Sequence, residues 1–105
     1  MTAPDTSESW RRVAPISKSD ADHMVASRGF LARYLVDQFR EAFGTNVEEV
    51  SVEMFPDGLL VTLVADVGPD SKYNVWAHTV AAAFTDAGAS VPINVVVRAA
   101  DELRT

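Results

Sequence analysis

Two histidines and their acidic neighbours are the residues of this sequence that could carry out chemistry. His23 follows Asp20 and Asp22, and one imidazole with two carboxylates is a set that could hold a divalent cation. The same two acids fall where the first turn of a helix would begin, and there negative charge stabilises the helix dipole. We therefore favour a capping role for both acids and predict no metal site.

The second histidine lies in a segment with few partners for catalysis. His78 is preceded by Asn74 and followed by Asp86, but no nucleophile stands near it in a recognisable pattern. A pocket around Tyr73, Trp76 and His78 would be the place for a small ligand. We expect Trp76 to be a core residue instead, because aromatic residues at helical spacing usually pack inward.

The sequence lacks the motifs of common active sites. It has no glycine-rich phosphate loop, no G-x-S-x-G turn and no pair of histidines four residues apart. It has no cysteine, which excludes disulfides, thiolate catalysis and Cys-ligated zinc or iron–sulfur clusters. Glu48 and Glu49 are adjacent before a predicted strand, so they point to opposite sides and cannot act as a pair. We predict a non-enzymatic protein without catalytic residues or cofactors.

The composition is that of one acidic domain. The chain has 105 residues, 48% of them hydrophobic, which suffices for a modest single core. Its net charge of −6 argues against nucleic acid as a partner, because phosphate binding relies on clustered Lys and Arg. No apolar run is long enough to span a membrane, and the N-terminus lacks the pattern of a signal peptide. We expect a soluble, cytoplasmic protein or a part of a soluble particle, without a membrane partner.

The elements that would position any site are organised around a predicted β-hairpin from Val47 to Val67. Apolar and polar residues alternate on both sides of Pro56-Asp57-Gly58. Proline presets φ for a turn, aspartate can bond its own backbone, and glycine accepts the positive φ that closes such a loop. The hairpin should therefore present one strongly apolar face.

Helical segments flank this hairpin. The first is predicted from Ser19 to Phe43, with a hydroxyl at its start and a glycine after its end. Gly29 could divide it, in which case Ser27 would cap a second segment that begins at Phe30.

A later helix and a strand complete the predicted fold. The helix runs over 72–87 and the strand over 92–97, so the order is helix, strand, strand, helix, strand. A right-handed crossover makes the last strand parallel to the second, and it could lie beside either the first or the second strand. We predict an α+β two-layer sandwich whose three-stranded mixed sheet has both helices on one face. Residues 1–18 form an extended tail and residues 19–105 a single domain.

The other face of the predicted sheet carries several apolar side chains, which a monomer seldom exposes. The tail around Trp10 could cover this face, another chain could cover it, or the side chains could simply be hydrated. Trp10 could also dock onto a neighbouring chain. The residues that we predict at an interface are Trp10, Val13, Phe55, Leu60, Thr62, Val64, Val96 and Arg98.

The element order from Ser19 to Arg98 resembles that of KH-type RNA-binding domains, including the ribosome-binding factor A family, and that of the cytoplasmic domains of cation-diffusion facilitators. Small α+β neck and tail-terminator subunits of phages are similar in size. The resemblance is one of topology, because the sequence has neither the GxxG loop of KH domains nor clustered histidine ligands. We assign no family from it.

Three functions remain open. The first is an interaction or assembly subunit that oligomerises or docks through the mixed sheet face, a sheet edge or the tail, as a scaffold, adaptor or particle component. The second is a KH-like or ribosome-associated nucleic-acid binder that uses Arg28, Arg33 and Arg40. The weakest is a small ligand-binding or enzymatic domain with the pocket described above.

Overall fold

The computed structural model describes residues 13–68 and 70–101. The elements in chain order are α1 (Lys18–Ala26), α2 (Arg28–Phe43), β1 (Val47–Phe55), β2 (Gly58–Ala65), α3 (Lys72–Asp86) and β3 (Ile93–Ala99). This arrangement confirms the predicted α+β fold, with the first helical segment divided into two helices.

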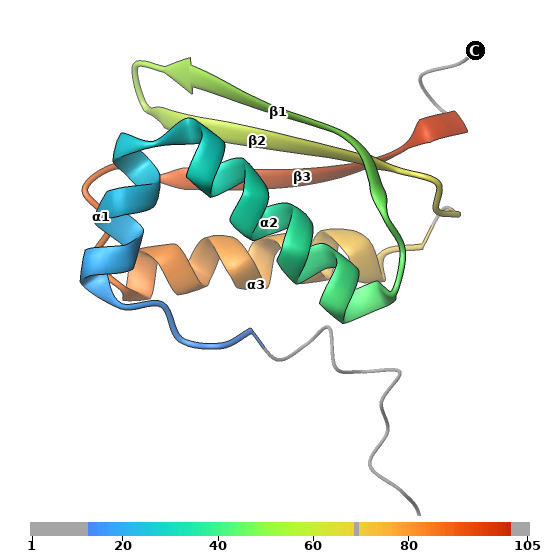
Figure 1. Ribbon diagram of the computed structural model, residues 1–105, viewed down its shortest axis with the longest axis horizontal. Helices are drawn as coiled ribbons and strands as arrows, with labels where there is room; N and C mark the ends of the chain where they lie inside the picture. Colours follow the sequence, from blue (N-terminus) through green and yellow to red (C-terminus); the bar gives the residue numbers. More distant parts are fainter. Residues whose placement is uncertain (1–12, 69, 102–105) are drawn as a thin grey trace, which may run out of the picture.

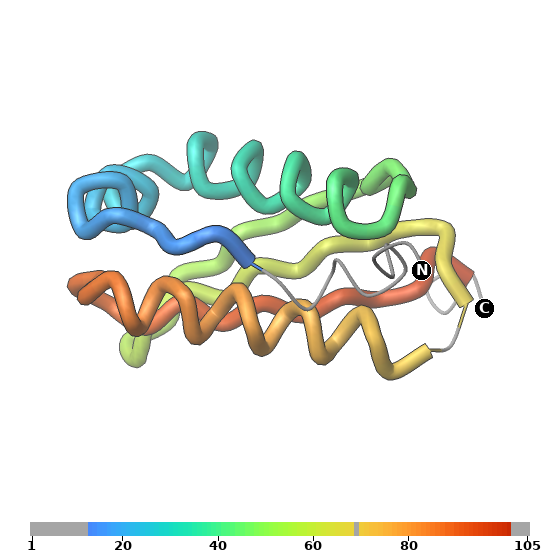
Figure 2. Tube along the Cα trace, turned by 90° about the horizontal axis from the view of Figure 1, so that it is seen from below, coloured from blue at the N-terminus to red at the C-terminus, as the bar shows by residue number. Residues whose placement is uncertain are grey.

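The fold has two layers, a three-stranded sheet and a layer of helices (Figure 1). β2 is the central strand; β1 pairs with it antiparallel and β3 pairs with it parallel. The last strand therefore lies beside the second strand, one of the two positions that the sequence left open. α2 contacts β1 and α3 contacts β3, and Figure 2 shows both helices on the same side of the sheet.

The hydrophobic core lies between these layers. Alternate residues of β2 and β3 point toward the helices, and the apolar stripes of α2 and α3 face them, as the periods of two and of three to four residues require. The largest fully buried side chains are Trp76, Phe39, Phe84, Met24, Leu31, Leu35, Leu63, Val61 and Val80. Trp76 is thus a core residue, as predicted.

The first helical segment is divided at Ser27, which has an extended backbone with φ −127° and ψ 101°. Its amide donates to the carbonyl of His23 at 3.0 Å and closes α1, while its hydroxyl accepts from the amide of Phe30 at 3.4 Å and caps α2. The alternative that placed a cap at Ser27 is therefore confirmed, although α2 begins at Arg28 and not at Phe30.

The turn of the hairpin consists of Pro56 and Asp57, between the paired residues Phe55 and Gly58. Gly58 has φ +149°, and a Cβ there would collide with the backbone carbonyl of Pro92. That carbonyl accepts a hydrogen bond from the amide of Leu59 at 2.9 Å. Glycine is thus required by its backbone angle and also by the approach of the chain that enters β3.

β1 contains an irregularity that changes which side chains face the helices. Val47 pairs with Ala65 and Glu49 pairs with Val64, so Glu48 is an extra residue in β1. As a result, Val47 packs against the core, although Glu49, two residues later, shares a face with Val64 on the other side of the sheet.

The segment before α1 packs on the helices. Figure 2 shows it passing between α2 and α3 on the side away from the sheet, and Val13 and Ile16 contact the core. Ser17 caps α1 by accepting from the amide of Asp20 at 3.0 Å, two residues before the predicted start at Ser19.

Candidate interaction surface

The face of the sheet that points away from the helices is the candidate functional surface, which we call the open face. Cross-strand pairing arranges its side chains in three rows of three, each with one residue from β1, β2 and β3. The rows are Glu49, Val64 and Arg98; Ser51, Thr62 and Val96; and Glu53, Leu60 and Asn94. Five of the predicted interface residues, Leu60, Thr62, Val64, Val96 and Arg98, are therefore brought together.

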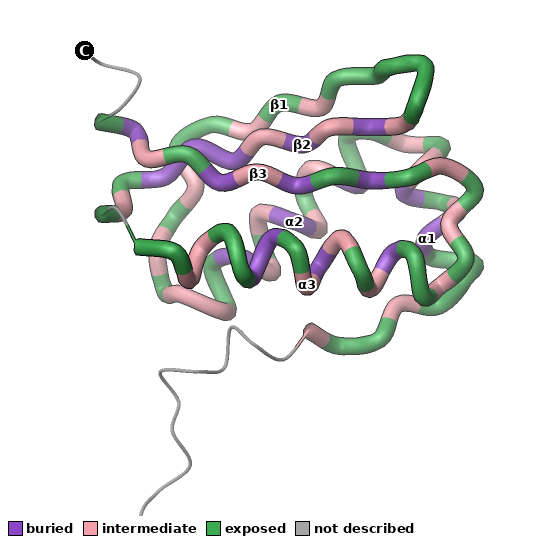
Figure 3. The backbone as a smooth tube through the Cα atoms, turned by 180° about the vertical axis from the view of Figure 1, so that it is seen from behind, coloured by how far each residue is buried: buried purple, intermediate pink, exposed green. Residues whose placement is uncertain are grey.

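The middle of the open face is accessible and partly apolar. Leu60, Thr62 and Val96 are half-buried, and Figure 3 shows half-buried residues alternating with buried ones along much of β2, and exposed or half-buried residues alternating with buried ones along β3. Phe55, at the hairpin end of β1, is 47% exposed. Phe55, Leu60 and Val96 are therefore accessible apolar side chains on this face.

Val64 differs from the other predicted interface residues, because it is only 8% exposed. Ala100, just after β3, is buried as well, and neither residue belongs to the core cluster beneath the helices. The apolar side chains at this end of the open face are therefore already buried, whereas Glu49 and Arg98 beside Val64 are exposed. The accessible apolar part centres on Leu60, Thr62 and Val96.

The charges on the open face are separated by sign. Glu49 and Glu53 lie on β1 at one side, and Arg98 lies on β3 at the other side. All three side chains are exposed, and in the part of the chain that the structure describes none of them forms an ion pair. Glu49 and Arg98 are two strands apart, roughly 10 Å, which is too far for a direct pair.

Sequence reasoning did not place Glu49 on this face. Regular alternation with Ser51 and Glu53 puts Glu49 on the open face, whereas the extra residue Glu48 moves Val47 to the core side of the sheet. The signal was present in the sequence, because Glu49 stands two and four residues before Ser51 and Glu53 and so shares their face of a regular strand.

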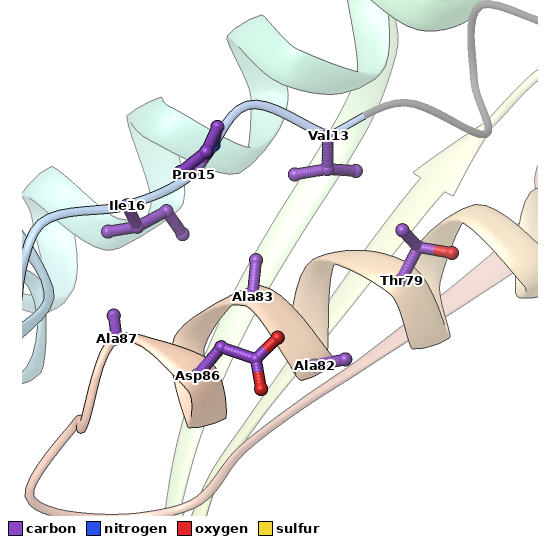
Figure 4. A pocket seen from close by; sticks show the side chains of 8 residues that line it. All are labelled: Val13, Pro15, Ile16, Thr79, Ala82, Ala83, Asp86 and Ala87. Atoms are coloured by element: carbon purple, nitrogen blue, oxygen red, sulfur yellow. The ribbon is translucent and has the colours of Figure 1, made fainter.

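Val13 lies elsewhere. It and Ile16 face α3 across a groove of about 320 Å³, whose other wall includes Ala83 and Asp86 (Figure 4). The groove is on the helical side of the domain, so Val13 does not join the open face. Trp10, the other predicted tail residue, lies outside the described residues.

The acids around His23 both lie on α1. Asp20 lies in the first turn of α1, as its predicted capping role requires, whereas the prediction is wrong for Asp22, which lies beyond that turn and accepts from Lys18 Nζ at 3.0 Å through Oδ2. His23 packs edge-on against Phe30, with ring centroids 4.7 Å apart. Over residues 13–68 and 70–101, no three His, Asp or Glu side chains are placed to hold a metal ion.

The residues of the predicted ligand pocket do not converge. Trp76 is buried in the core and His78 is exposed, while Tyr73 is half-buried against Phe43, with ring centroids 4.7 Å apart. A cavity of about 230 Å³ is lined by Tyr73 but by neither of the other two.

Tyr34 is a titratable residue whose environment changes its acidity. Burial raises its pKa above the ordinary value of 10.0, and the nearby carboxylates of Asp20 and Glu41 raise it further. Its ring packs edge-on against that of Phe84, with ring centroids 6.0 Å apart, and this pair belongs to the contact between α2 and α3.

Within the described ranges, no helix has the length and apolar character needed to cross a bilayer. Searches against protein-family models, curated proteins and solved structures found no match for this chain.

Proposed function

We propose that this protein is a non-enzymatic subunit of a protein assembly, which oligomerises or docks mainly through the open face. A sheet edge and the N-terminal tail would provide further contacts. The observation that carries the proposal is the group of adjacent half-buried side chains, Leu60, Thr62 and Val96, on the face that the described helices leave uncovered.

The physical argument concerns desolvation. Leu60, Thr62 and Val96 occupy adjacent positions on β2 and β3, so their apolar atoms form a continuous patch. Covering such a patch removes apolar surface from water, worth about 25 cal/mol per Å². Charged groups at its margin provide the polar rim of a protein interface.

A nucleic-acid function has less support. Arg28, Arg33 and Arg40 are exposed on α2, but Arg40 Nη2 lies 3.5 Å from Asp37 Oδ1, on the same helix. An acid within the stripe lowers the positive potential that phosphates require.

The proposal is tested by measuring mass in solution over a range of concentrations. Wild-type protein should exceed its monomer mass of 11.4 kDa, whereas Val96→Asp should be folded and smaller, because a carboxylate in a dry contact has no partner. We prefer Val96 to Val64 for this test, because Val64 is already buried and an aspartate there would destabilise the monomer itself.

Val75→Asp is the matched control, since Val75 is 45% exposed on α3, away from the open face. It should retain the wild-type mass. Circular dichroism verifies that both variants are folded. A wild-type protein that stays monomeric at all concentrations would reject the proposed function.

A further inference from the structure

We propose that the open face binds the open face of a second copy of this chain, about a two-fold axis parallel to the strands. In this arrangement β2 lies over the partner's β2, and β1 lies over the partner's β3. The inference rests on the proposed function, and it adds the identity of the partner and the orientation of the two sheets.

The charge pattern selects this axis. This two-fold axis runs parallel to β2, midway between the two facing sheets. Rotation about it keeps each residue at the same position along the strand direction and exchanges the β1 edge of the sheet with the β3 edge. Glu49 and Arg98 belong to the same row, so Glu49 would lie over the partner's Arg98, and Arg98 over the partner's Glu49. The symmetry thus produces two ion pairs between the chains. Within the described part of a single chain, neither Glu49 nor Arg98 forms an ion pair.

The other two-fold axis in the plane of the sheet is unfavourable. An axis perpendicular to the strands through Thr62 reverses each strand and leaves β1 over the partner's β1. Glu49 would then lie over the partner's Glu53, and the two like charges would repel twice in one dimer. Arg98 would lie over the partner's Asn94 and would leave both glutamates without a cation.

The favoured axis also matches the apolar side chains. Leu60 lies over the partner's Leu60, and Val96 lies over the short side chain of the partner's Ser51, so a large residue meets a small one. Glu53 faces the partner's Asn94, whose amide can donate a hydrogen bond to it. Face-to-face sheets pack about 10 Å apart with strands within about 30° of parallel, which preserves this matching of rows.

The size of the face determines the expected affinity. Three strands of about seven residues cover roughly 14 by 23 Å, or on the order of 300 Å² of flat area per partner. A standard interface buries about 800 Å² per partner. We therefore expect a dimer that dissociates on dilution, in which the two ion pairs have a measurable influence.

The test uses charge reversal and mixing, with sedimentation velocity as the measurement. Arg98→Glu alone sets two carboxylates against each other at both ion pairs, and Glu49→Arg alone sets two guanidinium groups against each other there. Each single variant should therefore dimerise at least tenfold more weakly than wild type. An equimolar mixture of the two should recover the wild-type affinity, because a mixed dimer contains one native and one reversed ion pair.

Two controls accompany this experiment. Arg33→Glu makes the same charge change at an exposed position on α2 and should leave dimerisation unchanged. The double variant Arg98→Glu/Glu49→Arg should dimerise with itself but not with wild type, which keeps the proposal testable if one single variant fails to fold.

The possible outcomes distinguish the proposed orientation of the dimer from the proposed assembly function. Single variants that associate as wild type does would overturn the proposed orientation while the assembly function stands. Single variants that are monomeric, with a mixture that remains monomeric, would overturn it as well. A wild-type chain that is monomeric at every concentration would overturn both the orientation and the proposed function.

Discussion

Gly58 is a residue at which one methyl group should have a large effect. Its φ of +149° is unfavourable for residues with a Cβ, and that atom would overlap the carbonyl of Pro92. We expect Gly58→Ala to lower the free energy of unfolding by roughly 1–3 kcal/mol, the usual cost of a strained backbone position. Urea denaturation followed by circular dichroism measures the change.

Gly29→Ala is the control for this prediction. Gly29 lies in α2, has no atom within 4 Å of an added Cβ, and has no positive φ. Alanine should therefore stabilise the helix by a few tenths to about 1 kcal/mol. Equal effects of the two substitutions would mean that the contact between the hairpin and Pro92 is unimportant.

At the scale of elements, Ser27 decides where one helix ends and the next begins. Its amide closes α1 and its hydroxyl caps α2. Ser27→Ala keeps the amide but removes the cap, and we expect a loss of about 1 kcal/mol in the free energy of unfolding. Ser90→Ala, at an exposed position outside the helices and strands, should change stability by less than about 0.5 kcal/mol. If Ser27→Ala were as stable as wild type, the backbone alone, and not the hydroxyl of Ser27, would determine where α1 ends and α2 begins.

β1 is an edge strand of the sheet and carries several acidic residues. No strand pairs with its outer edge in the described part of the chain, and it carries Glu48, Glu49 and Glu53. Charged residues on an edge strand oppose pairing with another chain at that edge. This arrangement favours association through the open face over association through β1.

At the scale of the whole molecule, the acidic charge predicts the behaviour toward nucleic acid. With a net charge of −6, the protein should not retain single-stranded RNA at physiological salt, because few counterions would be released on binding. Filter binding at low and physiological salt checks this expectation. Tight retention that weakens steeply with salt would instead support the KH-like alternative, and Arg33→Glu should then reduce it.

Much of the fold was determined by the sequence alone, because it depends on interactions within a few residues. The alternation around Pro56-Asp57-Gly58 specifies the hairpin, and the capping hydroxyl of Ser27 marks the break in the helix. Each of these features is local, so nearby residue types suffice to predict it.

The tertiary structure alone decided how these elements combine. The position of β3 beside β2 depends on packing between residues far apart in the chain, which periodicity does not encode. The alignment of Glu49 with Arg98 depends on the registers of β1 and β3 against β2, and the extra residue Glu48 reverses the face of Val47 before it. Consequently the apolar residues of the open face were predictable, whereas the burial of Val64 and the alignment of Glu49 with Arg98 were not.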